Sequence, residues 1–416
     1  MPKINPEIEA FARIKVVGIG GSGGNAITHM IQKKVKGVEF VAVNSDAQDL
    51  HHTPSPKKIH IGKNITRGLG TGMNPELGKR AAEETLEEIQ ETLKGSDMVF
   101  ITCGLGGGTG TGAAPIVAKT AREQGILTVG VVTKPFYFEG AQRLRIAESG
   151  LEELKRVVDT LIVIPNDRLL AIVDKETSFA NAFEMCDEIL RQAVEGISDL
   201  ITAPGIINVD FADIKSVMQD AGSALMGIGK AGGEGRAEQA ATEAINSPLL
   251  DISIEGAKGI LFAIAGGDDL TMLEVQEAAK IITESVDKDA RIIFGAFKDE
   301  KLKKGEIKVT VIATGFPNDA YGKKPGSFFG STDIHKGGSS SFGSILTGGK
   351  KEDGKPEDKE KKDEKKEEKK GIFNEPQAPV TPRRINISDS GKREEKPKQN
   401  DEDDWSAIPA FLRRKK

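Results

Sequence analysis

Two glycine-rich loops constrain this chain more than any other feature of its sequence. One spans residues 20–25 and the other residues 104–112, and each directly follows an apolar strand pattern and precedes a helical pattern. At such a junction the free amides at the positive end of a helix face the ligand, which favours an anion such as phosphate. The two loops therefore predict a cradle for the phosphates of a nucleotide.

Strand and helix patterns alternate along the first part of the chain. Apolar runs at 12–19, 38–43, 98–102, 126–133 and 160–165 alternate with helical patterns, one of which we expect to run unbroken over 76–94. This alternation predicts a mostly parallel sheet covered on both faces, with ligands outside the carboxyl ends of the strands. We therefore predict an α/β fold whose first domain, 12–177, is Rossmann-like and binds a nucleotide.

A second folded part follows this domain. Apolar residues at helical spacing form one face over 178–203, which predicts a long central helix. Apolar runs at 206–209, 259–265, 291–297 and 307–313, with helical patterns between them, then predict a smaller α/β domain at 204–316.

The composition changes after Phe316. Residues 317–400 are first rich in Gly and Ser, and the stretch 350–370 then holds 10 Lys against 9 acidic side chains. Such a segment cannot bury an apolar core, so we expect a disordered linker. The last segment, 401–416, combines acids, an apolar cluster and four basic residues, and we expect it to be a partner-binding peptide.

The overall charge argues against nucleic acid as a partner. The chain has 58 basic and 63 acidic side chains and a formal net charge of −5, so no global positive field exists. Its 2 Cys are too few for a disulfide framework or a zinc site. No signal-peptide core and no apolar run of about 18 residues is present, so we expect a cytoplasmic protein without direct membrane insertion.

The first loop alone admits two kinds of ligand. Its candidate contacts are Gly20, Gly21, Ser22, Gly23, Gly24 and Asn25. Gly18, Gly20 and Gly23 satisfy the dinucleotide fingerprint, and Asp46 could accept a ribose hydroxyl. An NAD-dependent oxidoreductase is therefore the competing hypothesis, disfavoured because no catalytic His or Lys stands near the fingerprint.

The second loop favours a triphosphate. Its candidate contacts are Gly107, Gly108, Thr109, Gly110, Thr111 and Gly112. Three phosphates need more donors than one turn offers, and the hydroxyls of Thr109 and Thr111 can hold phosphate or a magnesium-bound water. A Walker A motif is absent, because the segment 72–79 has the wrong spacing and lacks the following Ser or Thr.

The run GGGTGTG at 106–112 resembles the signature loop of the tubulin superfamily, and residues 12–316 resemble its bacterial cell-division GTPases. This resemblance implies a GTPase that self-assembly activates. It implies GTP or GDP held by the amides of 21–25 and 108–110, with Mg²⁺ bound through the phosphates. The further site residues that it implies are Thr133, Glu139 and Arg143, with ribose contacts from the last two, and Asn166 and Asp187 at the base.

Chemistry fits the base contacts. An aspartate can accept the two neighbouring N–H groups of guanine, and Phe183 lies one helical turn before Asp187, where its ring could stack on the purine. Without the resemblance, Phe183 would be interpreted as a core residue and Asp187 as a solvated charge. Glu139 and Arg143 would then form an exposed i,i+4 pair.

Two carboxylates, Asp210 and Asp213, follow the long helix. They suit polarisation of a water molecule, and the resemblance assigns this catalytic role to them together with Asn208. The rise of 1.5 Å per helical residue puts them about 25–30 Å from Asp187, so they would act on the nucleotide of a neighbouring subunit in a head-to-tail filament. The alternative is that Asp210 or Asp213 only caps a helix over 214–218.

The apolar cluster near the end of the chain, Trp405–Leu412, resembles the peptide through which this family docks on membrane-tethering and regulatory division proteins. The resemblance therefore implies a ring-forming filament at the mid-cell division site, beneath the membrane. Plasmid and phage relatives that segregate DNA are the alternative within the superfamily, and this peptide argues against them.

Overall fold

The computed structural model describes residues 12–170, 178–203, 205–247, 253–299 and 301–316, without the side chain of Phe179. The predicted linker (317–400) and the predicted terminal peptide (401–416) lie outside the described residues, and so does the docking motif Trp405–Leu412.

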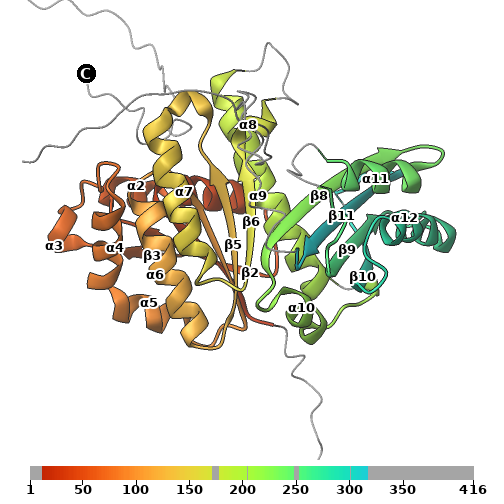
Figure 1. Cartoon of the computed structure of the whole chain (residues 1–416), viewed down its shortest axis with the longest axis horizontal. Helices are drawn as coiled ribbons and strands as arrows, with labels where there is room; N and C mark the ends of the chain where they lie inside the picture. The colour runs from red at the N-terminus through yellow and green to blue at the C-terminus, as the bar shows by residue number, and fades with distance from the viewer. Residues whose placement is uncertain (1–11, 171–177, 204, 248–252, 300, 317–416) are drawn as a thin grey trace, which may run out of the picture. The chain divides into compact units, whose positions relative to one another are not determined.

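The first half of the described chain alternates strands and helices, as predicted (Figure 1). Its elements are β1 (Ile14–Ile19), α1 (Gly20–Gln32), β2 (Val38–Asn44), α2 (Ala47–His52), β3 (Lys57–His60), α3 (Lys63–Thr66), α4 (Pro75–Glu84), α5 (Leu86–Leu93), β4 (Met98–Gly104), α6 (Thr109–Glu123), β5 (Leu127–Lys134), the 3-10 turn η1 (Tyr137–Glu139), α7 (Ala141–Lys155), β6 (Thr160–Pro165) and α8 (Asn166–Leu169). The strands pair in the order β3-β2-β1-β4-β5-β6, all parallel.

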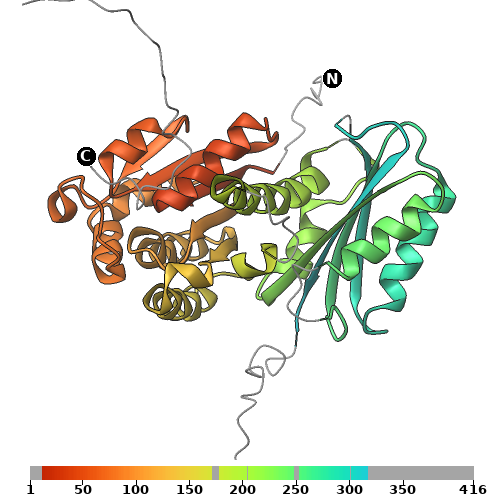
Figure 2. The ribbon, with the colours of Figure 1, turned by 90° about the horizontal axis from the view of Figure 1, so that it is seen from above.

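Helices cover both faces of this parallel sheet (Figure 2). On one face α1 packs with α9 (Phe179–Thr202) and α10 (Phe211–Met218) in a core that contains Phe100 and Phe136. On the other face α4, α5, α6 and α7 pack in a second core that contains Ile101 and Val117. The predicted class, a Rossmann-like α/β domain, is confirmed.

The long central helix is also confirmed. Helix α9 has 24 residues, and the Ser178 side chain caps it by accepting a hydrogen bond from the Asn181 amide. Its apolar face, including Leu190, Ala193 and Ile197, is buried in the core that it shares with α1. The helix is therefore held between the first sheet and the second half of the chain.

The second half is a smaller mixed sheet with helices. Its elements are β7 (Gly205–Ile207), α10, β8 (Gly222–Gly232), α11 (Arg236–Ile245), β9 (Gly259–Gly266), α12 (Met272–Glu284), β10 (Arg291–Lys298) and β11 (Glu306–Thr314). The strands continue the order as β8-β11-β9-β10-β7, and the start of β8 pairs parallel with β6. Helices α11 and α12 cover one face, while the other face joins the core around α9.

Two expectations of local structure need correction. The helix expected over 76–94 is two helices, because Thr85 leaves helical geometry at φ −112° and ψ 24° and its hydroxyl accepts from the Gly62 amide at 3.4 Å. Strands β3 and β8 were missing from the expected set, β8 because its glycines resemble a loop. The glycines of β8 allow α11 to pack closely on the strand, because a Cβ on Gly227 or Gly229 would lie 1.9 or 2.0 Å from a carbonyl oxygen of α11.

Candidate nucleotide-binding site

The two glycine loops lie side by side between β1 and β4, where the order of the strands in the sheet reverses. They follow β1 and β4, which are parallel neighbours, while α1 and α6 cover opposite faces of the sheet. Loops that leave adjacent strands toward opposite faces open a crevice at the carboxyl ends, which is where open α/β sheets bind ligands. The fold therefore brings together the two loops that the sequence singled out.

The run 20–25, predicted as a loop, forms the first turns of α1, and the second run becomes helical at Thr109, so both runs present the free amides of a helix N-terminus. Helix α1 begins at Gly20 and α6 begins at Thr109, and neither has a side-chain hydrogen bond at its N-cap or an acidic residue in its first turn. Uncapped N-terminal amides next to each other provide the donors and the positive potential that phosphate groups need. This part of the site fits an oligophosphate.

The glycines of the loops divide into two kinds. A Cβ on Gly104 would lie 2.6 Å from Ser22 Oγ, and one on Gly112 would lie 1.9 Å from the Pro75 oxygen, so these glycines allow close packing. A Cβ on Gly107 would meet nothing within 4 Å. Gly107 therefore borders open space, as expected for a residue that faces a ligand.

Three hydroxyl groups meet at the start of α6. The Thr109 hydroxyl lies 2.6 Å from Ser45 Oγ and 3.1 Å from Thr71 Oγ1, and all three side chains are buried. Thr111 Oγ1 accepts a hydrogen bond from the Gly106 amide and so orders the loop. The sequence interpretation included Thr109 and Thr111 but missed Ser45 and Thr71. The position of Ser45, two residues after the predicted strand 38–43, was the available signal.

The residues expected at the base come from α8 and α9. Asn166 is 5% exposed, and its Oδ1 is a buried polar atom without a hydrogen-bond partner among the described residues. Burial, with a smaller contribution from the Glu184 charge, raises the pKa of Asp187 to about 8. A buried acceptor without a donor and a desolvated carboxyl group fit a base that donates N–H groups.

Phe183 belongs to a row of aromatic rings beside these acceptors. Its ring meets the Phe136 ring edge-on at a centroid distance of 5.3 Å, and Phe136 stacks on Phe138 at 4.9 Å. Phe183 is only partly buried and packs against the core. Phe183 is therefore partly a core residue. Its stacking on the purine stays a prediction.

Glu139 and Arg143 are paired but not exposed. Arg143 Nη1 donates to Glu139 Oε2 at 2.7 Å, and the side chains are 13% and 7% exposed in that order. Glu139 Oε1 also accepts from the Phe136 amide. Thr133, at the end of β5, is buried, and its carbonyl oxygen accepts from the Leu105 amide under the second loop.

Asp46, the ribose acceptor of the competing dinucleotide hypothesis, has another task. Its Oδ1 accepts hydrogen bonds from the amides of Gln48 and Asp49, which caps α2. A carboxylate used in this way is a local helix cap and needs no ligand to explain it.

The carboxylates Asp210 and Asp213 lie beyond the other end of α9. Thr202 lies 15 residues after Asp187, which corresponds to about 22 Å along the helix axis. Asp210 Oδ1 accepts from the Asp213 amide and caps α10, so the capping alternative holds for Asp210. Both carboxylates are exposed, as is Asn208, whose Oδ1 accepts from the Gly205 amide at 2.7 Å. The fold does not bring these three residues to the glycine loops.

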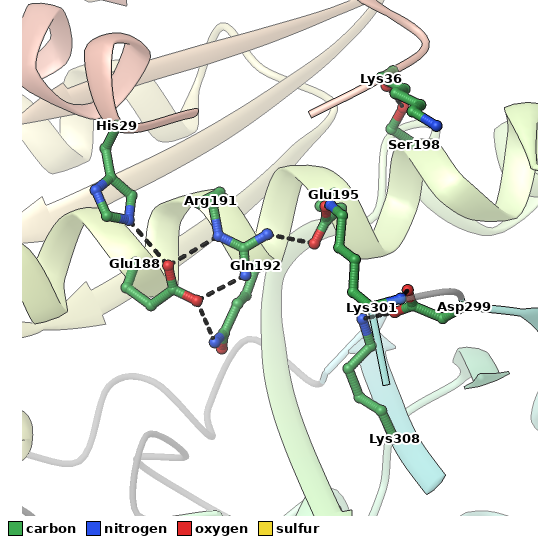
Figure 3. Close-up of polar contacts among 10 residues, drawn as sticks. All are labelled: His29, Lys36, Glu188, Arg191, Gln192, Glu195, Ser198, Asp299, Lys301 and Lys308. Carbon is green, nitrogen blue, oxygen red and sulfur yellow. Dashed lines mark hydrogen bonds and ion pairs between the residues drawn. The ribbon is translucent and has the colours of Figure 1, made fainter. Parts of the chain in front are cut away.

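A row of charged side chains lies along the middle of α9 (Figure 3). His29 Nε2 of α1 lies 2.9 Å from Glu188 Oε2, and Arg191 donates to both Glu188 and Glu195. Lys301, before β11, donates to Glu195 Oε1 at 2.5 Å. Burial opposes ionisation of Glu188, but hydrogen bonds from Arg191 and His29 outweigh it and lower its pKa to about 2. The row ties α9 to the helix that starts in the first glycine loop and to the second half of the chain.

The described residues contain neither a metal-binding cluster nor a membrane-spanning helix. Among them, no group of three or more His, Cys, Asp and Glu side chains is placed to hold a metal ion. None of the helices in the described ranges is long and apolar enough to cross a membrane.

Comparisons with known proteins agree with this geometry. The GTPase domain of the Tubulin/FtsZ family matches residues 13–174, and the C-terminal domain of the FtsZ family matches residues 222–317. An empty FtsZ dimer from M. jannaschii is 50% identical, with a TM-score of 0.70 over 73% of this chain and 88% of that chain.

More distant relatives share the fold. A GTPgS-bound protofilament of CetZ2 from Haloferax volcanii is 23% identical and has a TM-score of 0.63 over 74% of this chain and 94% of that chain. The GDP-bound monomer of CetZ1 from the same organism is 24% identical, with a TM-score of 0.64 over 74% and 95% of the two chains.

A parallel sheet with two glycine loops at its switch point, joined by a long helix to a smaller mixed sheet, defines a tubulin-like GTPase. The family models and the 50% identity are specific enough to decide against an NAD-dependent oxidoreductase. The chain belongs to the Tubulin/FtsZ family, on the FtsZ side. It binds guanine nucleotide and hydrolyses GTP.

Proposed function

We propose that this GTPase assembles head to tail and that each copy completes the nucleotide site of the next. The observation that carries the proposal is the exposure of Asp210 and Asp213 beyond the C-terminal end of α9, while Asp187 lies nearer its start. Carboxylates that polarise water must come within hydrogen-bond reach of it. In a single copy the length of α9 prevents this, so a second copy has to supply them.

In this proposal the nucleotide lies along the carboxyl ends of β1, β4, β5 and β6. The amides of 20–25 and 107–112 hold the phosphates together with the hydroxyls of Thr109 and Thr111. Glu139 and Arg143 lie toward the ribose, with Thr133 below them, and Asn166, Phe183 and Asp187 recognise the base. Mg²⁺ would be held mainly by the phosphates.

Exposed apolar side chains at both ends support the head-to-tail contact. Leu69, Tyr137, Phe138 and Leu170 follow the carboxyl ends of the first sheet and are 84%, 79%, 53% and 43% exposed. At the other end, Ile206 of β7 lies two residues before Asn208 and is 71% exposed, and the Arg291 guanidinium at the start of β10 donates to the Ser216 oxygen of α10 at 2.9 Å. Apolar groups exposed on two opposite surfaces favour association of copies.

We extend the proposal to the cell. Filaments of this kind would form the ring that marks the division site beneath the membrane, tethered by Trp405–Leu412 to membrane-anchored and regulatory division proteins. The functional units would be the GTP-binding domain 12–177, the central helix 178–203, the second domain 204–316, the linker 317–400 and the peptide 401–416. The 50% identity to an FtsZ supports this role over DNA segregation.

The proposal is tested by the dependence of turnover on subunit concentration. The rate of GTP hydrolysis per subunit is expected to rise steeply above a threshold concentration, because single copies lack the carboxylates. Asp213→Ala is expected to remove this rise while leaving GDP binding unchanged. A wild-type rate per subunit that stays constant with concentration would contradict the in-trans mechanism.

A further inference from the structure

A cluster of three hydroxyl groups, Ser45, Thr71 and Thr109, lies at the start of α6. Ser45 follows β2 and is 0% exposed, Thr71 precedes α4 and is 7% exposed, and Thr109 is the first residue of α6 and is 8% exposed. The Ser45 and Thr71 hydroxyls both bond to Thr109 Oγ1, at 2.6 and 3.1 Å. Segments far apart in the sequence thus converge on one side chain of the glycine loop.

The surrounding residues hold the cluster in place. The Thr66 hydroxyl donates to the Ser45 carbonyl oxygen at 3.0 Å, which fixes the backbone of Ser45. A Cβ on Gly108 would lie 2.2 Å from Thr71 Oγ1, so only glycine at this position lets Thr71 reach Thr109. The cluster is therefore an ordered part of the site and not a chance contact on the surface.

The number of protons in the cluster determines which hydroxyl groups donate the hydrogen bonds. Three hydroxyls carry three protons and share two hydrogen bonds, so one proton is left for an acceptor outside the cluster. In the described part of the chain, the hydrogen bonds of Ser45 Oγ and Thr71 Oγ1 are the two to Thr109. If both donate to Thr109, they fill its two lone pairs and avoid a buried unsatisfied donor, which would cost about 1–3 kcal/mol. The remaining proton then belongs to Thr109.

We propose that Ser45 and Thr71 are positioning residues that make the Thr109 hydroxyl a donor to a phosphate oxygen of the bound guanine nucleotide. The inference rests on the proposed nucleotide site. It adds that two residues outside the glycine loops determine how strongly the second loop binds phosphate. A hydroxyl whose lone pairs are both occupied by donors is also polarised, which strengthens its own hydrogen bond to an anion.

The test compares GDP with guanosine, which lacks phosphates, as ligands of the full chain. Ser45→Ala and Thr71→Val are each expected to weaken GDP binding about fivefold, the usual size for one hydrogen bond. Guanosine binding is expected to stay unchanged, because the cluster lies at the phosphate end. Thr71→Ser keeps the hydroxyl and is expected to keep the GDP affinity, which separates the hydrogen bond from packing.

A double-mutant cycle completes the test. Once Thr109→Val has removed the shared partner, Ser45→Ala is expected to cause no further loss of GDP affinity. Thr120→Val is the matched control, because it removes a buried hydroxyl of the same helix that bonds only to the Ile116 oxygen in the described chain. Thermal unfolding without nucleotide checks that each variant is folded.

The outcomes separate this inference from the site on which it rests. If Thr109→Val itself leaves GDP binding unchanged, the proposed phosphate site is wrong. If Thr109→Val weakens GDP binding but Ser45→Ala and Thr71→Val do not, only the positioning role is wrong. Losses that add fully to that of Thr109→Val, or that appear equally with guanosine, also overturn it, because they indicate a general structural defect.

Discussion

The carboxylates associated with the two ends of α9 have opposite surroundings. Asp187 is partly buried, and burial raises its pKa to about 8, whereas Asp210 and Asp213 are exposed beyond the other end. A desolvated carboxyl group gains most from a ligand that donates hydrogen bonds to it, while an exposed one is free to act on another molecule. This difference supports the proposal that Asp187 recognises the base and that Asp210 and Asp213 act on the nucleotide of another copy.

The largest effect is expected from Asp213→Ala. Loss of a group that polarises the attacking water costs about 10²- to 10⁴-fold in rate, so kcat should fall by at least about 100-fold with GDP affinity unchanged. Asp213 is a cleaner choice than Asp210, which also caps α10 and would lose about 1 kcal/mol of stability on substitution. Asp268→Asn is the control, since Asp268 is an exposed carboxylate paired with Lys298. Equal loss of activity in Asp213→Ala and Asp268→Asn would contradict the catalytic role of Asp213.

At the other end, Asp187→Asn is expected to weaken binding. Hydrogen bonds to a charged acceptor are worth about 1.5–3 kcal/mol, so GDP affinity should fall about 10- to 100-fold. Discrimination between guanine and adenine nucleotides should fall with it. Competition binding with GDP and ADP measures both, and unchanged selectivity would remove Asp187 from the base site.

The same residue predicts a pH dependence. Because the pKa of Asp187 is raised in the folded protein, its neutral form predominates below pH 8, and stability without nucleotide should fall as pH rises toward 8. Binding that requires the carboxylate should strengthen by up to about tenfold per pH unit up to pH 8 and then level off. GDP affinity between pH 6 and 9 measures this, and Asp187→Asn should flatten the profile. A profile that is equally steep in the variant would contradict the assignment.

Phe138 is one of the exposed apolar side chains at the nucleotide end, and its substitution tests assembly separately from nucleotide binding. Phe138→Ser is expected to raise the concentration threshold for GTP hydrolysis about fivefold, because burial of an aromatic side chain at an interface is lost. GDP binding to single copies should change little. Met272→Ser, at the start of α12, is the control because Met272 is 75% exposed and belongs neither to the nucleotide end nor to the segment that carries Asp210 and Asp213. Thresholds that move equally would argue against a contact at the nucleotide end.

The smallest effect concerns stability within α9. Burial, with the nearby Glu195 charge, raises the pKa of Asp199 to about 6 against the opposing effect of Lys308. Ionised Asp199 therefore costs stability that is recovered as pH falls below 6. Asn at this position should stabilise the protein at pH 8 by about 1–2 kcal/mol and have little effect at pH 4. Denaturant unfolding at both pH values measures the difference.

The sequence predicted the fold where patterns were regular. The strands of the first sheet alternate with helices of clear periodicity, and α9 has a continuous apolar face with Ser178 as its cap. Prediction failed at β8, where Gly227 and Gly229 are required by contact with α11 and not by a turn. Such a requirement depends on a helix further along the chain and is invisible locally.

The candidate site was predictable to the same extent. Loops at the ends of strands are marked by glycine and threonine, and the resemblance supplied Asn166 and Asp187, which chemistry alone would not select. Ser45 and Thr71 were missed because single hydroxyl residues carry no pattern, and only the fold brings them within 2.6 and 3.1 Å of Thr109. The burial of Glu139 and Arg143 was also unexpected. Their i,i+4 spacing predicts that the two side chains pair but not whether other residues shield the pair from solvent.

The central claim, that one copy completes the site of the next, is tested most directly by mixing two defective variants. Asp213→Ala keeps the nucleotide site but lacks the acid, and Asp187→Ala keeps the acid but lacks the base contact, so each alone should be nearly inactive at low GTP. In an equal mixture about one contact in four joins two intact halves, so turnover should recover to about one quarter of the wild-type rate. A mixture no faster than the sum of its two components would contradict the claim.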